Sequence, residues 1–350
     1  MPTRSGHRRV LVAAVAITLA APVSAVWQSA TPAAAASLTT AWHGGAFSEN
    51  VGGVVSRSDV VLGQPDSADS QSLPLGNGSL GVAAWAASGF TAQLNRSDTM
   101  PYRLSPGQVQ IPGLSAMTSA ANFTGYLDLY NGVLHESGGG ITLNAWVPEG
   151  KDELVVDVSG VNPSTQQSAT LSLWSGRSPS ATASGAYASL AQTWQDNAQT
   201  GNSGQTFGAM STITAGGQNV SASVVDSTDV KVSFTPNSNG TFRVIVAAPS
   251  WTGGNPESVA QSLVGGDASA GTSSLLATQS SWWNNFWANS GLIEVNSSDG
   301  TGQYMENLRT LYLYDEAATM RSGTYPGSQA GVADMFAYDK DQQDWYPAGY

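Results

Sequence analysis

Four aspartates near the end of the 350-residue sequence form its densest group of side chains able to do chemistry: Asp334, Asp339, Asp341 and Asp344. Enzymes that cleave glycosidic bonds use paired carboxyl groups, so the group is compatible with a catalytic or sugar-binding loop. Its oxygens are also suitable ligands for Ca²⁺, although the EF-hand spacing is not matched. A solvated acidic loop is the third interpretation, because runs of charge usually mark exposed faces.

The sequence has few residues for a metal site or for an active site with a cysteine or serine nucleophile. The sequence contains no cysteine, which excludes disulfides, thiolate zinc sites and a cysteine nucleophile. His7 belongs to a targeting segment, and neither His43 nor His135 lies near a nucleophile elbow, since the run from Gly327 to Gly331 has its serine one place early. We therefore expect no metal site and no cofactor.

The run from Gly76 to Gly81 spells G-x-G-x-x-G. In a dinucleotide site this motif follows a strand and opens a helix, so that the helix N-terminus faces the pyrophosphate. Here Leu80 to Trp85 has the pattern of a strand instead. We therefore interpret the glycines as a tight turn.

Composition favours an extracellular all-β protein with a sizeable core. Hydrophobic residues make up 41% of the sequence and charged residues only 11%, with 39 glycines. The formal net charge of −12 provides no basic surface for phosphates, so we expect no nucleic-acid partner and no binding to an anionic membrane. The 11 tryptophans mostly predict core packing, although their flat faces also suit sugar rings.

Residues 1–36 are interpreted as a signal peptide. A basic group between Arg4 and Arg9 precedes the apolar run Val10 to Ala21, and small-residue cleavage sites follow at 23–25 and 33–36. The start at Arg8 is compatible with twin-arginine export as well as with the general secretory route. Because the apolar run is shorter than the ~20 residues of a spanning helix, we expect a secreted, extracellular protein with no membrane association.

Residues 37–270 show the period-two alternation of β-strands. Apolar residues alternate with polar ones in 141–147, 220–224, 230–234 and 242–246, and clusters of Gly, Asn, Pro and Ser bound these runs. This pattern predicts antiparallel sheets with one wet face, packed as a sandwich. The segment from Ser178 to Thr206 is less regular and is interpreted as loops with at most one strand.

The pattern changes near residue 271. Aromatic residues recur at helical spacing between Leu275 and Trp287, which predicts a helix with an aromatic face. A short strand over 292–295 and a second helix over 301–320 follow, and glycines and prolines then predict a loop. We divide this part into a helical linker, 271–298, and the incomplete start of a further helical domain, 299–350.

Three segments resemble glycoside hydrolase family 95, the 1,2-α-L-fucosidase family, and its six-hairpin relatives. Leu73 to Gly81 with Gln93 to Thr99 is similar to P-x-G-N-G-x-L-G … L-N-E-D-T-L-W. Tyr126 to Leu129 is similar to the strand Y-x-R-x-L-D-L. Arg321 to Gly331, continuing to Trp345 and Tyr350, is similar to S-R-P-G-x-x-P-x-N-L-Q-G … P-P-W … Y.

The resemblance implies a mainly β fold: an antiparallel β-supersandwich, then a helical linker, then the truncated start of an (α/α)6 barrel. It implies an inverting glycoside hydrolase in which a protonated carboxyl donates to the leaving oxygen and an assisted water attacks the opposite face. The family's catalytic residues would lie beyond Tyr350, so this fragment alone is expected to be inactive.

We expect the loop after Arg321 to approach an oligosaccharide or glycoside substrate. Gln329 is expected to hydrogen-bond to the sugar, with Asp334, Asp344 and Trp345 at the rim. Packing against the first barrel hairpin is an equal interpretation of Trp345. The family implies a fucoside, and galactoside or another sugar stays open. The rival hypothesis is a stand-alone carbohydrate-binding β-sandwich module, since fold alone does not decide function.

Overall fold

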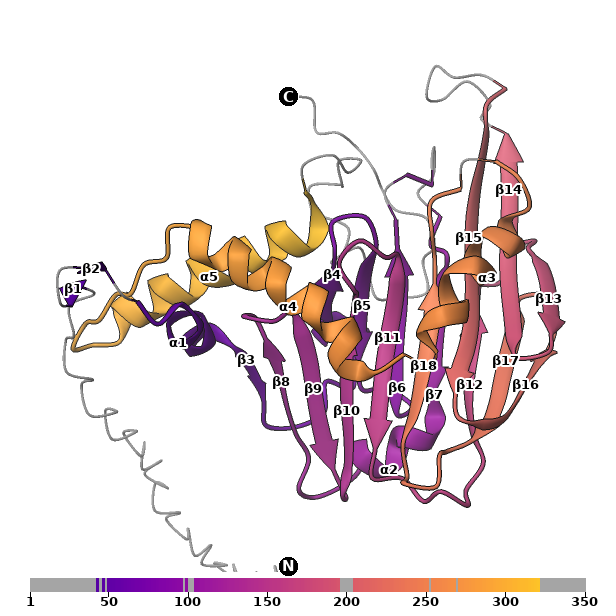
Figure 1. Ribbon diagram of the computed structural model, residues 1–350, viewed down its shortest axis with the longest axis horizontal. Coiled ribbons are helices and arrows are strands. Elements are labelled where there is room, and N and C mark those ends of the chain that lie inside the picture. Colours follow the sequence, from indigo (N-terminus) through magenta and orange to yellow (C-terminus); the bar gives the residue numbers. More distant parts are fainter. Residues whose placement is uncertain are drawn as a thin grey trace, which may run out of the picture. The chain divides into compact units, whose positions relative to one another are not determined.

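The computed structural model describes residues 42–43, 46–47, 49–96, 98–99, 104–195, 204–251, 253–268 and 270–321. The chain divides into two units at Glu49. The described part of the first unit is a pair of antiparallel strands, β1 (Trp42–His43) and β2 (Ala46–Phe47). The second unit begins at Asn50 and contains two large sheets with several helices (Figure 1).

Nine strands form the larger sheet, in the order β13-β14-β15-β18-β11-β10-β9-β8-β3, and every neighbouring pair is antiparallel. The strands are β3 (Val60–Leu62), β8 (Thr124–Asp128), β9 (Val133–Gly138), β10 (Ile141–Trp146), β11 (Glu153–Ser159), β13 (Ser180–Ser184), β14 (Tyr187–Gln195), β15 (Thr206–Gly216) and β18 (Phe242–Ala247).

Seven strands form the second sheet, in the antiparallel order β16-β17-β12-β7-β6-β5-β4. They are β4 (Leu73–Gly76), β5 (Gly81–Trp85), β6 (Phe90–Asn95), β7 (Gly107–Ile111), β12 (Gln167–Ser172), β16 (Gln218–Val224) and β17 (Asp229–Thr235). The four alternating runs of the sequence lie in β10, β16, β17 and β18, as predicted, except that β10 ends one residue before Val147.

The sandwich core lies between the two sheets. Alternation along β11 sends Leu154, Val156 and Val158 inward, where they join apolar side chains of the second sheet such as Val82 and Phe90 in one buried cluster. Burial of such side chains removes apolar surface from water and provides the main stabilisation. The predicted mainly β fold, an antiparallel sandwich followed by helices late in the chain, is confirmed.

The helices are short at the start of this unit and long at its end. They are α1 (Val51–Val55), α2 (Ser115–Thr118), α3 (Pro256–Asp267), α4 (Thr272–Asn289) and α5 (Thr301–Thr319), with 3₁₀ turns η1 (Ser56–Ser58), η2 (Asp69–Gln71) and η3 (Pro112–Leu114). In the described part of the chain, no helix combines the length and apolar character that crossing a bilayer requires.

The aromatic helix predicted from the sequence is α4. Its buried stripe comprises Leu275, Gln279, Trp283 and Trp287, each one turn after the last. Trp287 donates its indole N–H to the carbonyl of Leu129 at 2.8 Å. Trp283 stacks on Tyr314 of α5, with ring centroids 4.8 Å apart. The two helices are therefore packed on each other and on the sandwich.

Helices α3 and α4 cover part of the outer face of the nine-stranded sheet (Figure 1). Side chains of four central strands form a second apolar cluster there with Val264 of α3 and Leu275 of α4. The members from the sheet are Val133, Trp146, Val155, Ile245 and Ala247. The opposite ends of the same strands carry polar residues on this face.

Three local predictions were wrong. Residues 292–295 form no strand, because the Val295 N–H donates to the Glu306 carboxylate of α5 at 2.7 Å. Segment 178–206 contains two strands, β13 and β14, which pair with each other. Helix α3 lies where a strand region was expected, although Asn255 caps it by accepting from the Ser258 N–H at 3.0 Å and Pro256 occupies its first turn.

Candidate functional site

The four residues predicted to lie near a sugar are outside the described residues, so their placement stays a prediction: Gln329, Asp334, Asp344 and Trp345. The segment that leads to them is described as far as Arg321, which lines a pocket of about 660 Å³. We call this the junction pocket. Its walls are the β4–β5 turn with Asn77 and Ser79, the β10–β11 loop with Glu149 to Asp152, Pro249 and Ser250 after β18, Trp282 of α4, and Arg321.

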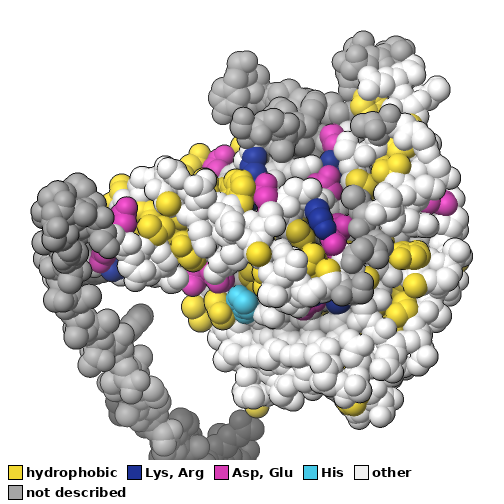
Figure 2. Space-filling view, in the orientation of Figure 1, with side chains coloured by type: hydrophobic (Ala, Val, Ile, Leu, Met, Phe, Trp, Pro, Cys, Tyr) yellow, Lys and Arg dark blue, Asp and Glu magenta, His cyan; other side chains and the backbone are white. Residues whose placement is uncertain are grey.

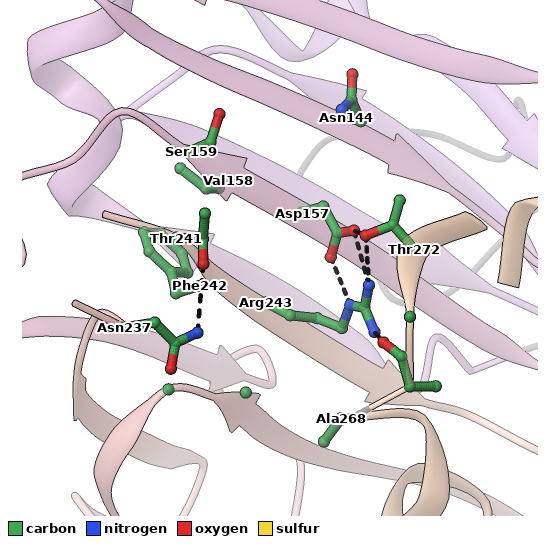
Figure 3. Close-up of a pocket in the computed structure, with 14 residues that line it drawn as sticks. Asn144, Asp157, Val158, Ser159, Asn237, Thr241, Phe242, Arg243, Ala268 and Thr272 are labelled. Atoms are coloured by element: carbon green, nitrogen blue, oxygen red, sulfur yellow. Dashed lines mark hydrogen bonds and ion pairs between the residues drawn. The ribbon is translucent and has the colours of Figure 1, made fainter. Parts of the chain in front are cut away.

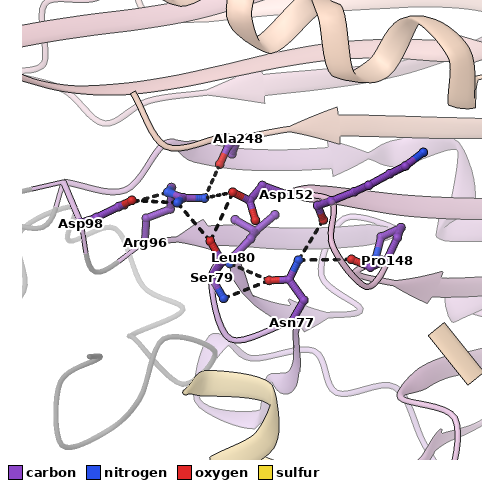
Figure 4. Close-up of polar contacts among 9 residues, drawn as sticks. Asn77, Ser79, Leu80, Arg96, Asp98, Pro148, Asp152 and Ala248 are labelled. Carbon is purple, nitrogen blue, oxygen red and sulfur yellow. Dashed lines mark hydrogen bonds and ion pairs between the residues drawn. The ribbon is translucent and has the colours of Figure 1, made fainter. Parts of the chain in front are cut away.

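Asn77 shapes the first wall. Its side-chain carbonyl accepts hydrogen bonds from the N–H groups of Ser79 at 3.0 Å and Leu80 at 2.9 Å, which closes the turn between β4 and β5. Its amide donates to the carbonyls of Pro148 at 3.2 Å and Lys151 at 2.9 Å (Figure 4). One side chain thus holds two loops together, and the predicted tight turn is confirmed.

The glycines of this turn receive the end of α5. Gly78 has a left-handed φ of +81°, and its N–H donates to the carbonyl of Ala318 at 2.9 Å. A β-carbon on Gly78 would overlap the side chain of Arg321, and one on Gly76 would overlap the Ala318 carbonyl. The motif that resembles a dinucleotide fingerprint therefore docks a helix C-terminus, because only glycine permits this close approach.

Arg96 fixes the strand ends behind the pocket. It is 3% exposed and donates to both oxygens of Asp98 at 2.8 Å, to Asp152 at 2.6 Å and to the Ala248 carbonyl at 2.9 Å (Figure 4). Burial opposes its charge, but the two carboxylates outweigh burial and raise the Arg96 pKa. Burial likewise acts against the Asp98 carboxylate, yet Arg96 lowers its pKa. This network orients Asp152 in the pocket wall.

Arg321 and Trp282 form the wall on the helix side. The guanidinium carbon of Arg321 lies 3.3 Å from the centroid of the Trp282 ring, and its Nε donates to the Ala317 carbonyl at 2.8 Å. It also forms an ion pair with Glu149. Burial lowers the Arg321 pKa, although the nearby Glu149 carboxylate acts in the opposite direction. Stacking on Trp282 and the ion pair with Glu149 hold the Arg321 guanidinium at the C-terminal end of α5.

The remaining charges of the pocket come from the β10–β11 loop. Lys151 forms an ion pair with Asp267 of α3, and Glu149 and Asp152 present carboxylates beside it. Carboxylates, an ammonium group, a hydroxyl and an indole ring together suit a ligand with several hydroxyl groups. In the part of the chain that the structure describes, no three His, Asp or Glu residues are grouped to hold a metal ion.

Two of the three family-like segments meet at this pocket. The first contributes Asn77, Ser79 and the Arg96 network, and the third begins at Arg321. The second lies elsewhere and supports α4, since Leu129 accepts from Trp287. Sequence reasoning missed Glu149, Lys151 and Asp152. The signal was available as a polar loop between two apolar strands, where functional residues often lie.

The comparisons with known proteins concern the fold. No protein-family model and no curated protein matches the sequence. A putative kojibiose phosphorylase from the human microbiome matches with a TM-score of 0.55 and 13% identity, covering 81% of this chain and 44% of that chain. At this identity the likeness establishes the fold alone.

Weaker likenesses involve two other enzymes. The family GH92 inverting mannosidase BT2199 from Bacteroides thetaiotaomicron gives a TM-score of 0.36, with 11% identity and coverage of 66% of this chain and 30% of that one. A bacterial glucoamylase complexed with acarbose gives 0.33, with 9% identity and coverage of 73% and 44%. The chain spans less than half the length of each of these three structures.

Proposed function

We propose that this chain is the N-terminal part of a secreted glycoside hydrolase of the six-hairpin kind, acting on oligosaccharides or glycosides with inversion. The fold shared with a putative kojibiose phosphorylase over 81% of the chain carries the proposal. The family-like segments that meet at the junction pocket support it. An α-L-fucoside is the substrate that the sequence resemblance favours.

In this proposal the junction pocket is the sandwich's contribution to sugar binding. Glu149, Lys151 and Asp152 offer acceptors and donors to sugar hydroxyls, and Trp282, with Arg321 stacked on its ring, adds apolar surface to the wall. The segment after Arg321 would bring Gln329 and Trp345 to the same sugar. The acid and the base of an inverting reaction, which need space for a water between them, would come from chain beyond Tyr350.

The first measurement is the intact mass of the protein secreted by its native host. A mass well above that of the 350 residues supports a larger enzyme, and cleavage within residues 1–36 supports export. A mass at or below that value, with no cleavage of any glycoside, would replace the hydrolase by the rival carbohydrate-binding module.

The second measurement is activity of the complete secreted protein on aryl α-L-fucosides, galactosides, mannosides and glucosides, with and without inorganic phosphate. Hydrolysis without phosphate, with inversion seen by NMR, is the expected result. A strict requirement for phosphate would instead indicate phosphorolysis, the activity named for the putative kojibiose phosphorylase.

The junction pocket itself is tested by Lys151→Ala, with Lys231→Ala on β17 as the matched control, because Lys231 lies in the other sheet. We expect K151A to raise KM by about tenfold, the cost of one or two charge-assisted hydrogen bonds. Equal kinetics for K151A and K231A would remove the pocket from sugar binding.

Trp345→Ala should raise KM or lower kcat, and unchanged kinetics would leave Trp345 as a packing residue.

A further inference from the structure

The part of the nine-stranded sheet that α3 and α4 leave uncovered contains two adjoining hollows on its outer face. The first, of about 370 Å³, is lined by Val61, Tyr126, His135, Ser137, Thr142 and Asn144, among others. The second, of about 560 Å³, is lined among others by Asn144, Asp157, Ser159, Thr241, Arg243 and Thr272 (Figure 3). Asn144 lines both, so we treat them as one surface, the outer groove.

An aromatic wall stands in the first hollow. Tyr126 and His135 occupy directly paired positions of β8 and β9, and their rings stack with centroids 4.7 Å apart and planes 24° apart. Tyr126 is 41% exposed, and its neighbour Val61 on the edge strand β3 is 76% exposed. Figure 2 shows a histidine beside hydrophobic side chains on this face. Exposed apolar groups gathered beside polar ones mark binding surfaces.

The polar groups beside the wall are mostly uncharged, with the exception of the Asp128 carboxylate, which lies 3.9 Å from the Nε2 of His135. Asn144 shares a hydrogen bond of 2.6 Å with the Nδ1 of His135, and Thr142 pairs its hydroxyl with that of Ser159 at 2.6 Å. Short side chains of this kind leave acceptors and donors at the surface of the sheet. Such groups can exchange hydrogen bonds with the hydroxyls of a ligand.

The charges of the second hollow neutralise each other. Arg243 donates to both oxygens of Asp157 at 2.5 and 2.8 Å (Figure 3). It also donates to the Asp267 carbonyl at 2.9 Å. Its side chain is 7% exposed, so it connects the sheet to the α3–α4 junction and does not project into the groove as a free cation. A groove of balanced charge on a protein of net charge −12 disfavours an anionic occupant.

We propose that the outer groove binds a neutral oligosaccharide. A sugar ring packs its C–H face against the Tyr126–His135 wall, and its hydroxyls exchange hydrogen bonds with Asn144 and Thr142. Aromatic contact supplies area without charge, and the amide and hydroxyl groups supply orientation. The surface is separate from the junction pocket and stands whether or not the proposed glycosidase activity is found.

The experiment titrates the full 350-residue chain with maltohexaose, cellohexaose, xylohexaose and mannohexaose by calorimetry, with trigalacturonic acid as the anionic comparison. We expect at least one neutral hexasaccharide to bind with a Kd at or below about 1 mM. Tyr126→Ala should raise that Kd by about tenfold. Thr142→Arg, which fills the groove from an exposed position, should abolish binding.

The controls separate the groove from unrelated effects. Tyr304→Ala removes a tyrosine that is 61% exposed on α5, and Ser223→Arg adds an arginine to an exposed position of the other sheet. Both should bind like the unmodified chain, with unfolding curves confirming that all four variants fold. The proposal is overturned if no neutral hexasaccharide binds, if binding survives both groove variants, or if trigalacturonic acid alone binds.

Discussion

At the scale of single residues, Arg96 joins three strand ends through one guanidinium. The side chains of its partners Asp98 and Asp152 are only 24% and 19% exposed, so a neutral replacement would leave two largely buried carboxylates without their cation. We expect Arg96→Met to lower the free energy of unfolding by about 3–5 kcal/mol. Lysine cannot make the same forked contacts, so Arg96→Lys should recover only part of this loss.

Urea denaturation of both Arg96 variants measures the effect. Arg309→Met is the matched control, because Arg309 makes a single hydrogen bond to the described residues, to the Ser290 carbonyl at 3.1 Å, and should cost no more than about 1 kcal/mol. If R96M and R309M cost the same, the Arg96 network does not hold the strand ends together.

Two buried glutamates make stability depend on pH. Glu136 is 3% exposed and Glu153 is 0% exposed. Burial, reinforced by the neighbouring Asp66, raises the pKa of Glu136 to about 8. Burial together with Asp267 raises the pKa of Glu153 to about 8. Both carboxyls therefore keep a proton in the folded protein that the unfolded chain releases near pH 4.5.

This difference in proton binding makes the folded protein less stable as the pH rises. The stability that the two protonated glutamates contribute is fully present below about pH 4.5 and is lost as the pH rises through about 8, because the folded state binds more protons than the unfolded state in that window. Each group contributes a slope of up to ~1.4 kcal/mol per pH unit. The free energy of unfolding should therefore fall between pH 5 and 8, and E136Q and E153Q should each flatten the fall. An unchanged slope in both variants, matching the exposed-site control E49Q, would contradict this assignment.

At the scale of elements, the β4–β5 turn depends on a glycine that touches α5. Gly78 and Gly140 have nearly the same φ, +81° and +82°, but a β-carbon at Gly140 would meet open space. We expect Gly140→Ala to cost about 1–2 kcal/mol from backbone strain alone. Gly78→Ala should cost more, because it also displaces Arg321. Equal losses in thermal unfolding would show that the turn does not constrain α5.

Helix α4 is held by its tryptophans. Trp283 is fully buried between Gly132 and Tyr314, so Trp283→Ala should lower the free energy of unfolding by about 3–5 kcal/mol. Asn285→Ala, at an exposed position of the same helix, should have little effect. Hydrogen exchange should show early loss of protection in α4 and α5 of W283A. Protection equal to that of N285A would argue against this anchoring.

At the scale of the whole molecule, helices α4 and α5 share one core with the sandwich. Trp283, Trp287 and Tyr314 belong to the same buried cluster as the inner faces of the two sheets. A chain of residues 37–271 would expose the surfaces that α4 covers. We expect it to aggregate and to bind a hydrophobic dye, whereas residues 37–321 stay monomeric in light scattering. A monomeric, cooperatively folding 37–271 would instead establish the predicted division near residue 270.

Local patterns predicted the strands and α4, because the alternation of apolar and polar residues in a strand and the apolar stripe of a helix depend on residues close together in the sequence. Strand order, the meeting of the β4–β5 turn with Arg321, and the outer groove depend on contacts between distant segments, which no local pattern records. Helix α3 was missed although Asn255 and Pro256 signalled its start, because it is short and contains Gly265 and Gly266, and glycine disfavours a helix interior. The junction pocket was missed for a related reason: Asn77, Lys151 and Arg321 come together only in the folded chain.

Because α3 and α4 cover part of the outer face, this face is protected only after both helices have been synthesised. Trp146, Val155 and Ile245 emerge during synthesis well before Leu275 and Val264 can shield them. A nascent chain stalled near residue 250 therefore presents a bare apolar surface on a sheet whose pairings span long stretches of sequence, and such sheets form slowly. Release of the chain through at least Asn289 thus marks the earliest moment at which this face is protected from neighbouring nascent chains.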